Sequence, residues 1–327
     1  MCCQVFSLVP GILYPIVFLC FVLIFFYPGK RLHLLCCQNL IIRPRSLSNR
    51  LSCLQSIRSV QSDPFPYLFT QQALPDQLYL ELESSFPEEL ILDRVTKMDA
   101  GSPTRRLQFA EAVNWHDLPP IWEDFLRFHI SVDFFRSVIR LFEPYLLSSL
   151  GSFRLDQLLE SNVSPRNIGQ SDLLVTDCQF VVNEPLAEGH TSQPPHVDNP
   201  KEIYAGLLYM RRSDDDAFGG DLTLHRLSRR IVQLDKAKGR PISSRLHQPV
   251  QSIPYRANTF CLFLNLLGAV HSVSPRVNSH VRRRSINIIG EYCNRDRMWN
   301  VSHIDSRKGI FEQLKDKCKS RLRRLMS

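Results

Sequence analysis

The spacing of apolar residues predicts a helix near the start of the ordered chain. Leu78, Leu82 and Phe86 recur every four residues, which places them on one face of a helix. The alternation of Leu78, Leu80 and Leu82 also fits a strand, so both interpretations stay open at this point. Pro87 ends the segment on either interpretation, because proline lacks the backbone N–H that a continuing element needs.

Two further helices are predicted before the chain changes character. One begins near Pro119-Pro120, and the next follows Ser131, a residue type that commonly caps helix N-termini. Apolar residues recur along both segments at spacings of three and four: Trp122, Phe125, Phe128, Phe134, Val138 and Phe142. This periodicity predicts helices that pack their aromatic faces on a sheet.

From about residue 172 the pattern becomes one of short strands separated by turn-rich pieces. Gly219-Gly220-Asp221 marks a tight turn, and residues 236–245 are polar without a period, which is typical of a loop. Because these strands do not alternate with helices, they predict a sandwich or barrel, and with the earlier helices an α+β protein. The predicted strands are LLVTDCQFVV, IYAGLLYM, GDLTLHRL, QPVQSIPY, NTFCLFLN and RRSINIIGEY.

Residues 5–27 form an uncharged apolar segment that could anchor the protein in a membrane. A span needs roughly 20 apolar residues, and this segment lacks the cleavage site of a signal peptide. Lys30, Arg31, Arg43 and Arg45 follow it, so the positive-inside rule predicts a cytoplasmic body. The alternative is an over-extended reading frame, translated from upstream of the true start.

Charge and cysteine content narrow the classes of function. The net charge is +8, and basic residues gather toward both ends of the chain, which favours solvated or membrane-proximal tails over nucleic-acid binding. Six of the ten cysteines fall within the first 53 residues, and the other four are scattered without a CxxC pair. The body therefore has no disulfide-like framework and suits a reducing compartment.

The sequence His196-Val197-Asp198, followed by a lone His271, is a candidate metal site. Residues two apart on an extended segment point to the same side, so His196 and Asp198 can bind one ion together. Two imidazoles and one carboxylate form the facial triad of non-haem Fe(II) enzymes, which leaves the other face of the ion open. A zinc hydrolase would more often show HExxH, which the sequence lacks.

A basic strand follows the last of these residues. On an extended strand Arg283, Ser285 and Asn287 share one face, while Ile286 and Ile288 share the other. An inward-facing arginine can grip a carboxylate with two parallel hydrogen bonds, which predicts a site for a small dicarboxylate. The plainer interpretation is an exposed basic cluster at residues 282–284.

At these positions the chain resembles the Fe(II)/2-oxoglutarate-dependent oxygenases, and within them the prolyl-4-hydroxylase-like branch. The resemblance covers roughly residues 172–292. The motifs that carry it are HVDNP, LLYM with the acidic turn SDDDAFGGDL, NTFCLFLNLLGAVHSVSPR and RRSINI. It implies a double-stranded β-helix, or jelly roll, supported by N-terminal helices. It also implies an iron- and 2-oxoglutarate-dependent dioxygenase that hydroxylates a substrate and releases succinate and CO2, with ascorbate as an additional cofactor to test.

The resemblance assigns roles to individual residues. His196, Asp198 and His271 become the catalytic iron ligands, and Arg283 with Ser285 becomes the 2-oxoglutarate-binding pair. Tyr209 falls where the family often has a co-substrate-binding tyrosine. The stretch between His271 and the arginine is a few residues longer than usual, which leaves residues 282 and 284 as alternatives; Arg283 is preferred because Ser285 shares its face.

The predicted organisation has four parts. Residues 1–37 are the anchor or over-extended start, 38–61 a linker, 62–300 the oxygenase domain and 301–327 a basic C-terminal helix. The expected partners are O2 and a peptide, sugar or small-molecule substrate. The alternative function is a catalytically inactive jelly-roll protein, tethered to a membrane, that binds a ligand or partner.

Overall fold

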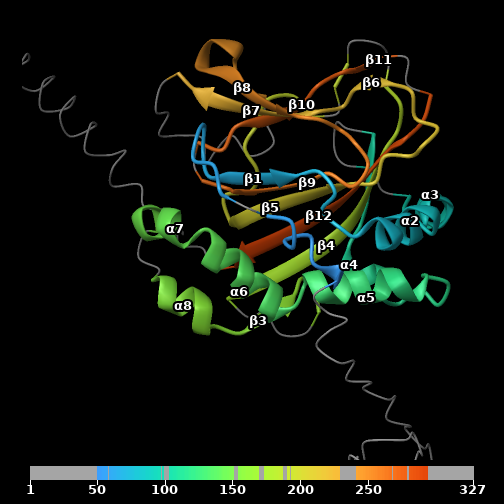
Figure 1. Ribbon diagram of the computed structural model, residues 1–327, viewed down its shortest axis with the longest axis horizontal. Helices are drawn as coiled ribbons and strands as arrows, with labels where there is room; N and C mark the ends of the chain where they lie inside the picture. Colours follow the sequence, from blue (N-terminus) through green and yellow to red (C-terminus); the bar gives the residue numbers. More distant parts are fainter. Residues whose placement is uncertain are drawn as a thin grey trace, which may run out of the picture. The chain divides into compact units, whose positions relative to one another are not determined.

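A large, mostly antiparallel sheet forms the centre of the protein, which Figure 1 shows as a computed structural model. The structure describes residues 50–293 apart from gaps at 58, 97, 99–102, 151–153, 169–172, 187–189, 192, 229–240, 267 and 278–279. In spatial order the strands are β1 (Tyr67–Thr70), β9 (Phe260–Leu264), β5 (Glu202–Tyr209), β12 (Arg283–Tyr292), β4 (Leu174–Asn183) and β2 (Thr104–Leu107), with β3 (Val163–Pro165) parallel to β4.

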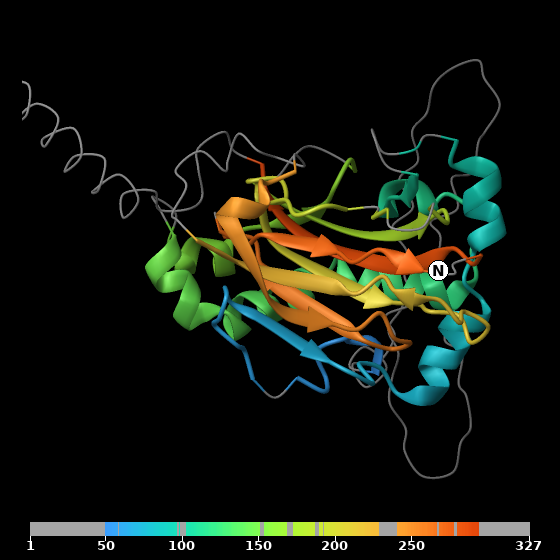
Figure 2. The ribbon, with the colours of Figure 1, turned by 90° about the horizontal axis from the view of Figure 1, so that it is seen from above.

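Smaller sheets lie across one face of the large sheet, and the helices cover its opposite face (Figures 1 and 2). The three-stranded sheet has the order β10 (His271–Val273), β7 (Leu222–Leu227) and β8 (His247–Ile253), and a two-stranded ribbon pairs β11 (Arg276–Val277) with β6 (Phe218–Gly219). Because both faces of the sheet are covered, β4 is buried along its whole length, including its polar side chains. The predicted combination of helices with a strand-rich second half is confirmed.

The helices precede most of the strands in the chain. They are α2 (Asp76–Ser84), α3 (Glu88–Arg94), α4 (Phe109–Ala112), α5 (Pro120–His129), α6 (Val132–Leu141), α7 (Glu143–Ser149) and α8 (Leu155–Glu160). The three predicted helices correspond to α2, α5 and α6. In α2 the side chains of Leu78 and Leu82 are buried while Leu80 is 62% exposed, so the strand interpretation of this segment was wrong. Ser131 caps α6, because its Oγ accepts a hydrogen bond from the Phe134 N–H at 3.2 Å.

Two apolar layers hold these elements together. On the helix side, Phe180 of β4 packs edge-on against Phe86 and Trp122, with ring centroids 5.4 and 4.8 Å away. Between the sheets, a second cluster includes Leu224 of β7 and Phe263 of β9. The large sheet is therefore fixed on both faces, and side chains on its upper face are held at defined positions.

The folded domain begins before residue 62, where the sequence predicted it to start. Cys53 is fully buried, and its backbone N–H donates to Nε2 of His129 at 3.4 Å. Leu51, Leu54 and Ile57 are partly buried and pack against the same core. The described part of the predicted linker, residues 50–57 and 59–61, thus belongs to the domain.

Several predictions concern residues that the structure does not describe. The apolar segment at residues 5–27, the rest of residues 1–49 and the basic helix predicted for 301–327 all lie outside the described ranges. Within those ranges, none of the helices combines the length and apolar character that crossing a membrane requires.

The buried His129 makes stability depend on pH. Its Nδ1–H donates to the Phe125 carbonyl at 2.9 Å, and burial lowers its pKa from 6.5 to about 3. Between those two values the unfolded chain binds more protons than the folded chain, so acid destabilises the fold. We expect this residue alone to lower the free energy of unfolding by about 2 kcal/mol between pH 6.5 and pH 5.

Urea unfolding of wild type and His129→Gln at pH 7 and pH 5 measures this contribution. The variant should lose less stability on acidification than wild type, by about 2 kcal/mol. His116→Gln, which changes an exposed histidine, serves as the control and should keep the wild-type pH dependence. An identical pH dependence in His129→Gln and wild type would contradict the burial of a neutral imidazole at this position.

Candidate metal centre

Two histidines from distant parts of the chain face each other on neighbouring extended segments. The backbone N–H of His196 donates to the carbonyl of His271 at 3.0 Å, and the reverse hydrogen bond is also 3.0 Å long. Such a reciprocal pair puts both side chains on the same face of the ladder. The two imidazole centroids are accordingly only 4.4 Å apart.

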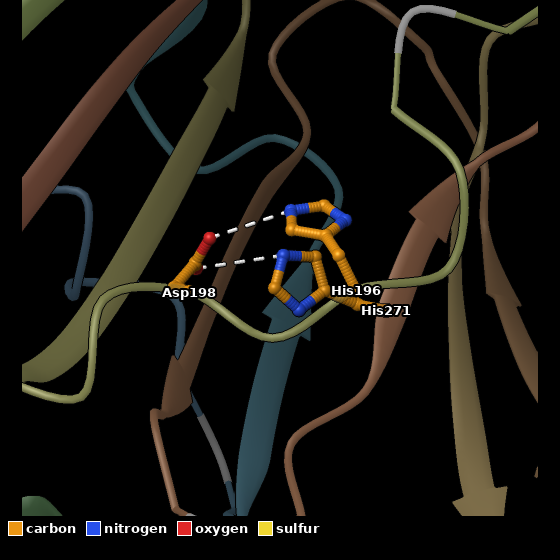
Figure 3. Close-up of side chains that lie close together, drawn as sticks. All are labelled: His196, Asp198 and His271. Atoms are coloured by element: carbon orange, nitrogen blue, oxygen red, sulfur yellow. Dashed lines mark ion pairs between the residues drawn. The ribbon is translucent and has the colours of Figure 1, made fainter. Parts of the chain in front are cut away.

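Asp198 completes the group from the segment that carries His196. Its Oδ1 lies 3.5 Å from Nε2 of His196, and its Oδ2 lies 3.4 Å from Nε2 of His271 (Figure 3). One ligand atom from each residue lies within 4.8 Å of the others. Among the described residues, this is the single group of three histidine, cysteine or acidic side chains that close together. The structure thus brings together the three residues that the sequence predicted to converge.

The second nitrogen of each ring fixes its orientation. Nδ1 of His196 lies 2.7 Å from the Pro194 carbonyl, and Nδ1 of His271 lies 3.0 Å from the Ala269 carbonyl. A carbonyl oxygen can only accept, so each Nδ1 carries the proton and each Nε2 can present a lone pair toward Asp198. Metal-binding histidines are commonly held this way, through the nitrogen that does not bind the ion.

The charges of the three side chains favour a cation between them. Burial would raise the pKa of Asp198, but the charge of His271 and hydrogen bonds from the two imidazoles, which they can donate through Nε2 only when protonated, hold it well below its usual value. Burial would likewise lower the pKa of His271, but the negative charge of Asp198 raises it. A divalent ion would supply the positive charge that this carboxylate otherwise draws from protonated imidazole.

The three side chains open into a cavity of about 640 Å³. Its floor is the upper face of the large sheet, where alternate residues of one strand face the cavity and the intervening ones face the helices. From β12 the cavity-lining residues are Arg283, Ser285, Asn287, Ile289 and Glu291. Ile286 and Ile288 are buried in the helix-side core, so the predicted division of this strand into two faces is confirmed.

Arg283 lies at one end of this cavity and is 4% exposed. Its Nε donates to the Gly220 carbonyl at 3.2 Å, and its Nη1 donates to Oδ1 of Asn183 at 3.4 Å. Its guanidinium carbon lies 4.9 Å from the ring centroid of Tyr209 and 4.7 Å from that of Tyr255. These contacts fix the guanidinium group, yet its buried Nη2 finds no partner within the described residues.

The neighbouring arginines point elsewhere. Arg282 donates to Glu184 at 2.6 Å, and Arg284 donates to Glu83 at 2.7 Å. Of these three arginines, only Arg283 lines the cavity into which the three candidate metal ligands open. The basic cluster is therefore mostly engaged in ion pairs rather than exposed to solvent.

Polar atoms near Arg283 also lack partners. The Oγ of Ser285 and the hydroxyl of Tyr209 are buried and make no hydrogen bond to any described residue. The two residues face each other in register across β12 and β5. Burying a polar group without a partner costs about 1–3 kcal/mol, so such groups next to a free guanidinium N–H indicate a polar ligand.

Sequence reasoning did not identify the residues that hold Arg283. Asn183 ends β4, Tyr255 follows β8, and Gly220 belongs to the predicted tight turn. Gly220 has a φ of +81°, and the neighbouring Gly219 has a φ of +84°. The pair of glycines in the sequence was therefore the one indication of a positive-φ backbone at this turn. The other two contacts depend on strand pairings that the sequence alone does not specify.

No family model and no curated protein matches this chain. Among solved structures, it is similar to a prolyl-4-hydroxylase from Pseudomonas putida, with 12% identity and a TM-score of 0.39 over 75% of this chain and 98% of the other. A Trichoplax adhaerens prolyl hydroxylase in complex with a hypoxia-inducible-factor peptide gives 12% identity and 0.41 over 76% and 90%. A dioxygenase for auxin oxidation from Arabidopsis thaliana, in complex with 2-oxoglutarate, gives 14% and 0.41 over 72% and 87%. Similarities at this level carry no functional conclusion for this chain.

Removing one imidazole should eliminate metal binding without unfolding the protein. We expect His196→Ala to weaken ferrous-ion binding by more than about 100-fold, because loss of an outer-shell partner alone costs 10–100-fold. Anaerobic titration calorimetry measures the affinity, and circular dichroism reports the fold.

His280→Ala replaces an exposed histidine and provides the matched control, which should bind the ion as wild type does. Equal ferrous affinity in His196→Ala and His280→Ala would show that the ion binds elsewhere.

Proposed function

We propose that the protein is a non-haem Fe(II)- and 2-oxoglutarate-dependent dioxygenase that hydroxylates its substrate and releases succinate and CO2. The observation that carries this proposal is a single cavity with two complementary sets of groups. It is lined by His196, Asp198 and His271 and also by the buried Arg283, which has unpartnered polar atoms beside it.

The donor set supports iron as the metal. Two histidine nitrogens and one carboxylate, all from one side, are the ligands of Fe(II) oxygenases, in which the remaining positions receive co-substrate and oxygen. The described residues add no cysteine to this group, and the four described cysteines are free thiols elsewhere in the chain.

The far end of the cavity supports 2-oxoglutarate as co-substrate. Arg283 would bind its distal carboxylate, because a fixed guanidinium can offer N–H groups to both oxygens of a carboxylate. Ser285 and Tyr209 would donate their hydroxyls to the same carboxylate, which satisfies the two oxygens that lack partners. Burial keeps the Tyr209 pKa raised, although the Arg283 charge opposes this, so the hydroxyl retains its proton for donation.

We propose that the strands form a jelly roll, which their order supports, and that the protein belongs to the prolyl-4-hydroxylase-like branch, which rests on the sequence motifs. Strands β9, β5, β12 and β4 are neighbours in the large sheet, while β8, β7, β10 and the segment at His196 are neighbours opposite them. Along the chain from β4 to β12, connections pass repeatedly between these two layers. A double-stranded β-helix is built from such alternation.

The protein residues would contribute positioning and exclusion of water. When bound, ferrous iron, 2-oxoglutarate and O2 supply the oxidising chemistry that inserts one oxygen atom into a substrate C–H bond. Phe263 and Leu222 line the cavity as apolar walls. The fixed Arg283 would orient the keto acid. A peptide, a sugar and a small molecule are all substrates of suitable chemistry. The cavity has the metal-binding group and the carboxylate-binding group that the proposed reaction needs. The structure therefore lends no support to the alternative, a catalytically inactive binding protein.

Substitution of Arg283 tests the co-substrate assignment. We expect Arg283→Lys to raise the 2-oxoglutarate concentration for half-saturation by about 10–100-fold, since a hydrogen bond to a charged group contributes roughly 1.5–3 kcal/mol. The measurement is anaerobic binding of 2-oxoglutarate to the Fe(II)-loaded protein, followed by succinate formation in air.

Arg282→Lys is the matched control, because this neighbour pairs with Glu184 away from the cavity and should leave the affinity for 2-oxoglutarate unchanged. A similar loss of affinity in both variants, or in neither, would falsify the role given to Arg283. Tight 2-oxoglutarate binding by wild type without succinate formation under any substrate tested would favour the inactive binding protein.

A further inference from the structure

A second acidic residue, Glu202, faces the cavity beside the metal centre. It is the first residue of β5, where the pairing with β12 shifts register: Gly290 pairs with Tyr204, but Glu291 pairs with Glu202. This shift leaves Ile203 as an extra residue, so β5 has a β-bulge here. Ile203 and Tyr204 are both buried in the helix-side core. The bulge thus turns Glu202 toward the cavity, where strict alternation would point it away.

The bulge sets two carboxylates opposite each other. Glu202 and Glu291 are cross-strand partners that both line the cavity, and like charges in this position are destabilising. Glu291 is compensated: it pairs with Nη2 of Arg166 at 3.0 Å and accepts a hydrogen bond from Nδ2 of Asn199 at 3.0 Å. Arg166 also reaches Asp177 at 3.2 Å, so its guanidinium is already shared between two acids.

Glu202 makes no such direct contact. Within the part of the chain that the structure describes, no hydrogen bond or salt bridge reaches its carboxylate. Arg166 and Arg106 line the same cavity, and their positive charges act on Glu202 at longer range. A carboxylate that faces a cavity without a hydrogen-bonded donor is typical of a position where a ligand supplies one.

A second acceptor on the same floor also lacks a donor. Oδ1 of Asn287 is buried and finds no partner among the described residues. Asn287 lines the cavity on the same face of β12 as Glu291. Glu202 and Asn287 therefore offer hydrogen-bond acceptors to a ligand, whereas Arg283, Ser285 and Tyr209 offer donors. Arg106 and Arg166 also line the cavity.

We propose that Glu202 recognises a positively charged nitrogen group of the substrate, an ammonium or a guanidinium, at the end of the cavity opposite Arg283. The inference rests on the proposed function, in which Arg283 binds the co-substrate and leaves this end to the substrate. Arg283 and Glu291 lie at opposite ends of β12, roughly 25 Å apart along the strand at about 3.3 Å per residue, so the two ligands need not compete.

Matched probes that differ in a single charge test this assignment. The ammonium pair is N-acetyl-lysine amide and N-acetyl-norleucine amide, and the guanidinium pair is N-acetyl-arginine amide and N-acetyl-citrulline amide. Titration calorimetry with full-length protein, loaded with Mn²⁺ and 2-oxoglutarate, measures each affinity. We expect the charged member of at least one pair to bind at least 10-fold more tightly than its neutral counterpart, and which pair responds identifies the cation.

Variants assign the effect to Glu202. Glu202→Gln should remove the preference for charge, whereas Glu123→Gln, on the exposed side of α5, should retain it. Because Glu202→Gln also relieves the like-charge pair with Glu291, its melting temperature should equal or exceed that of wild type. A lower melting temperature would assign Glu202 a structural role and overturn the proposal.

Failure of this inference is distinguishable from failure of the proposed function. Binding of 2-oxoglutarate to the Mn²⁺-loaded protein is measured first in the same experiment, and its absence would count against the dioxygenase itself. If 2-oxoglutarate binds normally but neither charged probe is preferred, or if Glu202→Gln keeps the preference, the cation-recognising role of Glu202 is wrong while the dioxygenase proposal stands.

Discussion

The reciprocal backbone hydrogen bonds between His196 and His271 are the constraint on which the rest of the site depends. They hold two short segments in one register, and a slip of one residue in either segment would turn its imidazole to the other face of the ladder, away from its partner. Asp198 reaches the same point only because it lies two residues beyond His196 on an extended segment. Carbonyl groups at Pro194 and Ala269 then orient the rings, so the backbone supplies most of the geometry of the centre.

The large sheet provides a second, independent set of constraints. Its strand β12 is buried on both faces and presents a different chemistry at each end of the cavity: a guanidinium at residue 283 and a carboxylate at residue 291. Arg283 is costly to bury, and the structure offsets that cost with two aromatic faces and two acceptors while leaving Nη2 without a partner among the described residues. The opposite end compensates Glu291 through Arg166 and leaves Glu202 without a hydrogen bond or salt bridge among the described residues.

Sequence patterns were sufficient where a feature depends on local spacing. The helices with four-residue aromatic stripes, the two faces of β12 and the convergence of His196 and Asp198 all follow from periods of 3.6 and 2. Short helices such as α3 and α7 were not predicted, because seven residues give too few repeats to define a stripe. The bulge at Ile203 reverses the alternation that a regular strand would show, so the facing of Glu202 could not be read from the chain. Contacts between distant residues, such as Cys53 with His129, depend on the assembled fold.

We propose that one cavity binds a ferrous ion through three side chains and a keto acid through Arg283. A crystal structure of the anaerobic protein with Fe(II) and 2-oxoglutarate tests it most directly. We expect anomalous density for iron within bonding distance of Nε2 of His196, Nε2 of His271 and a carboxylate oxygen of Asp198, with the distal carboxylate of the keto acid on Arg283. Iron bound at other residues, or a keto acid whose distal carboxylate contacts a different arginine, would contradict it.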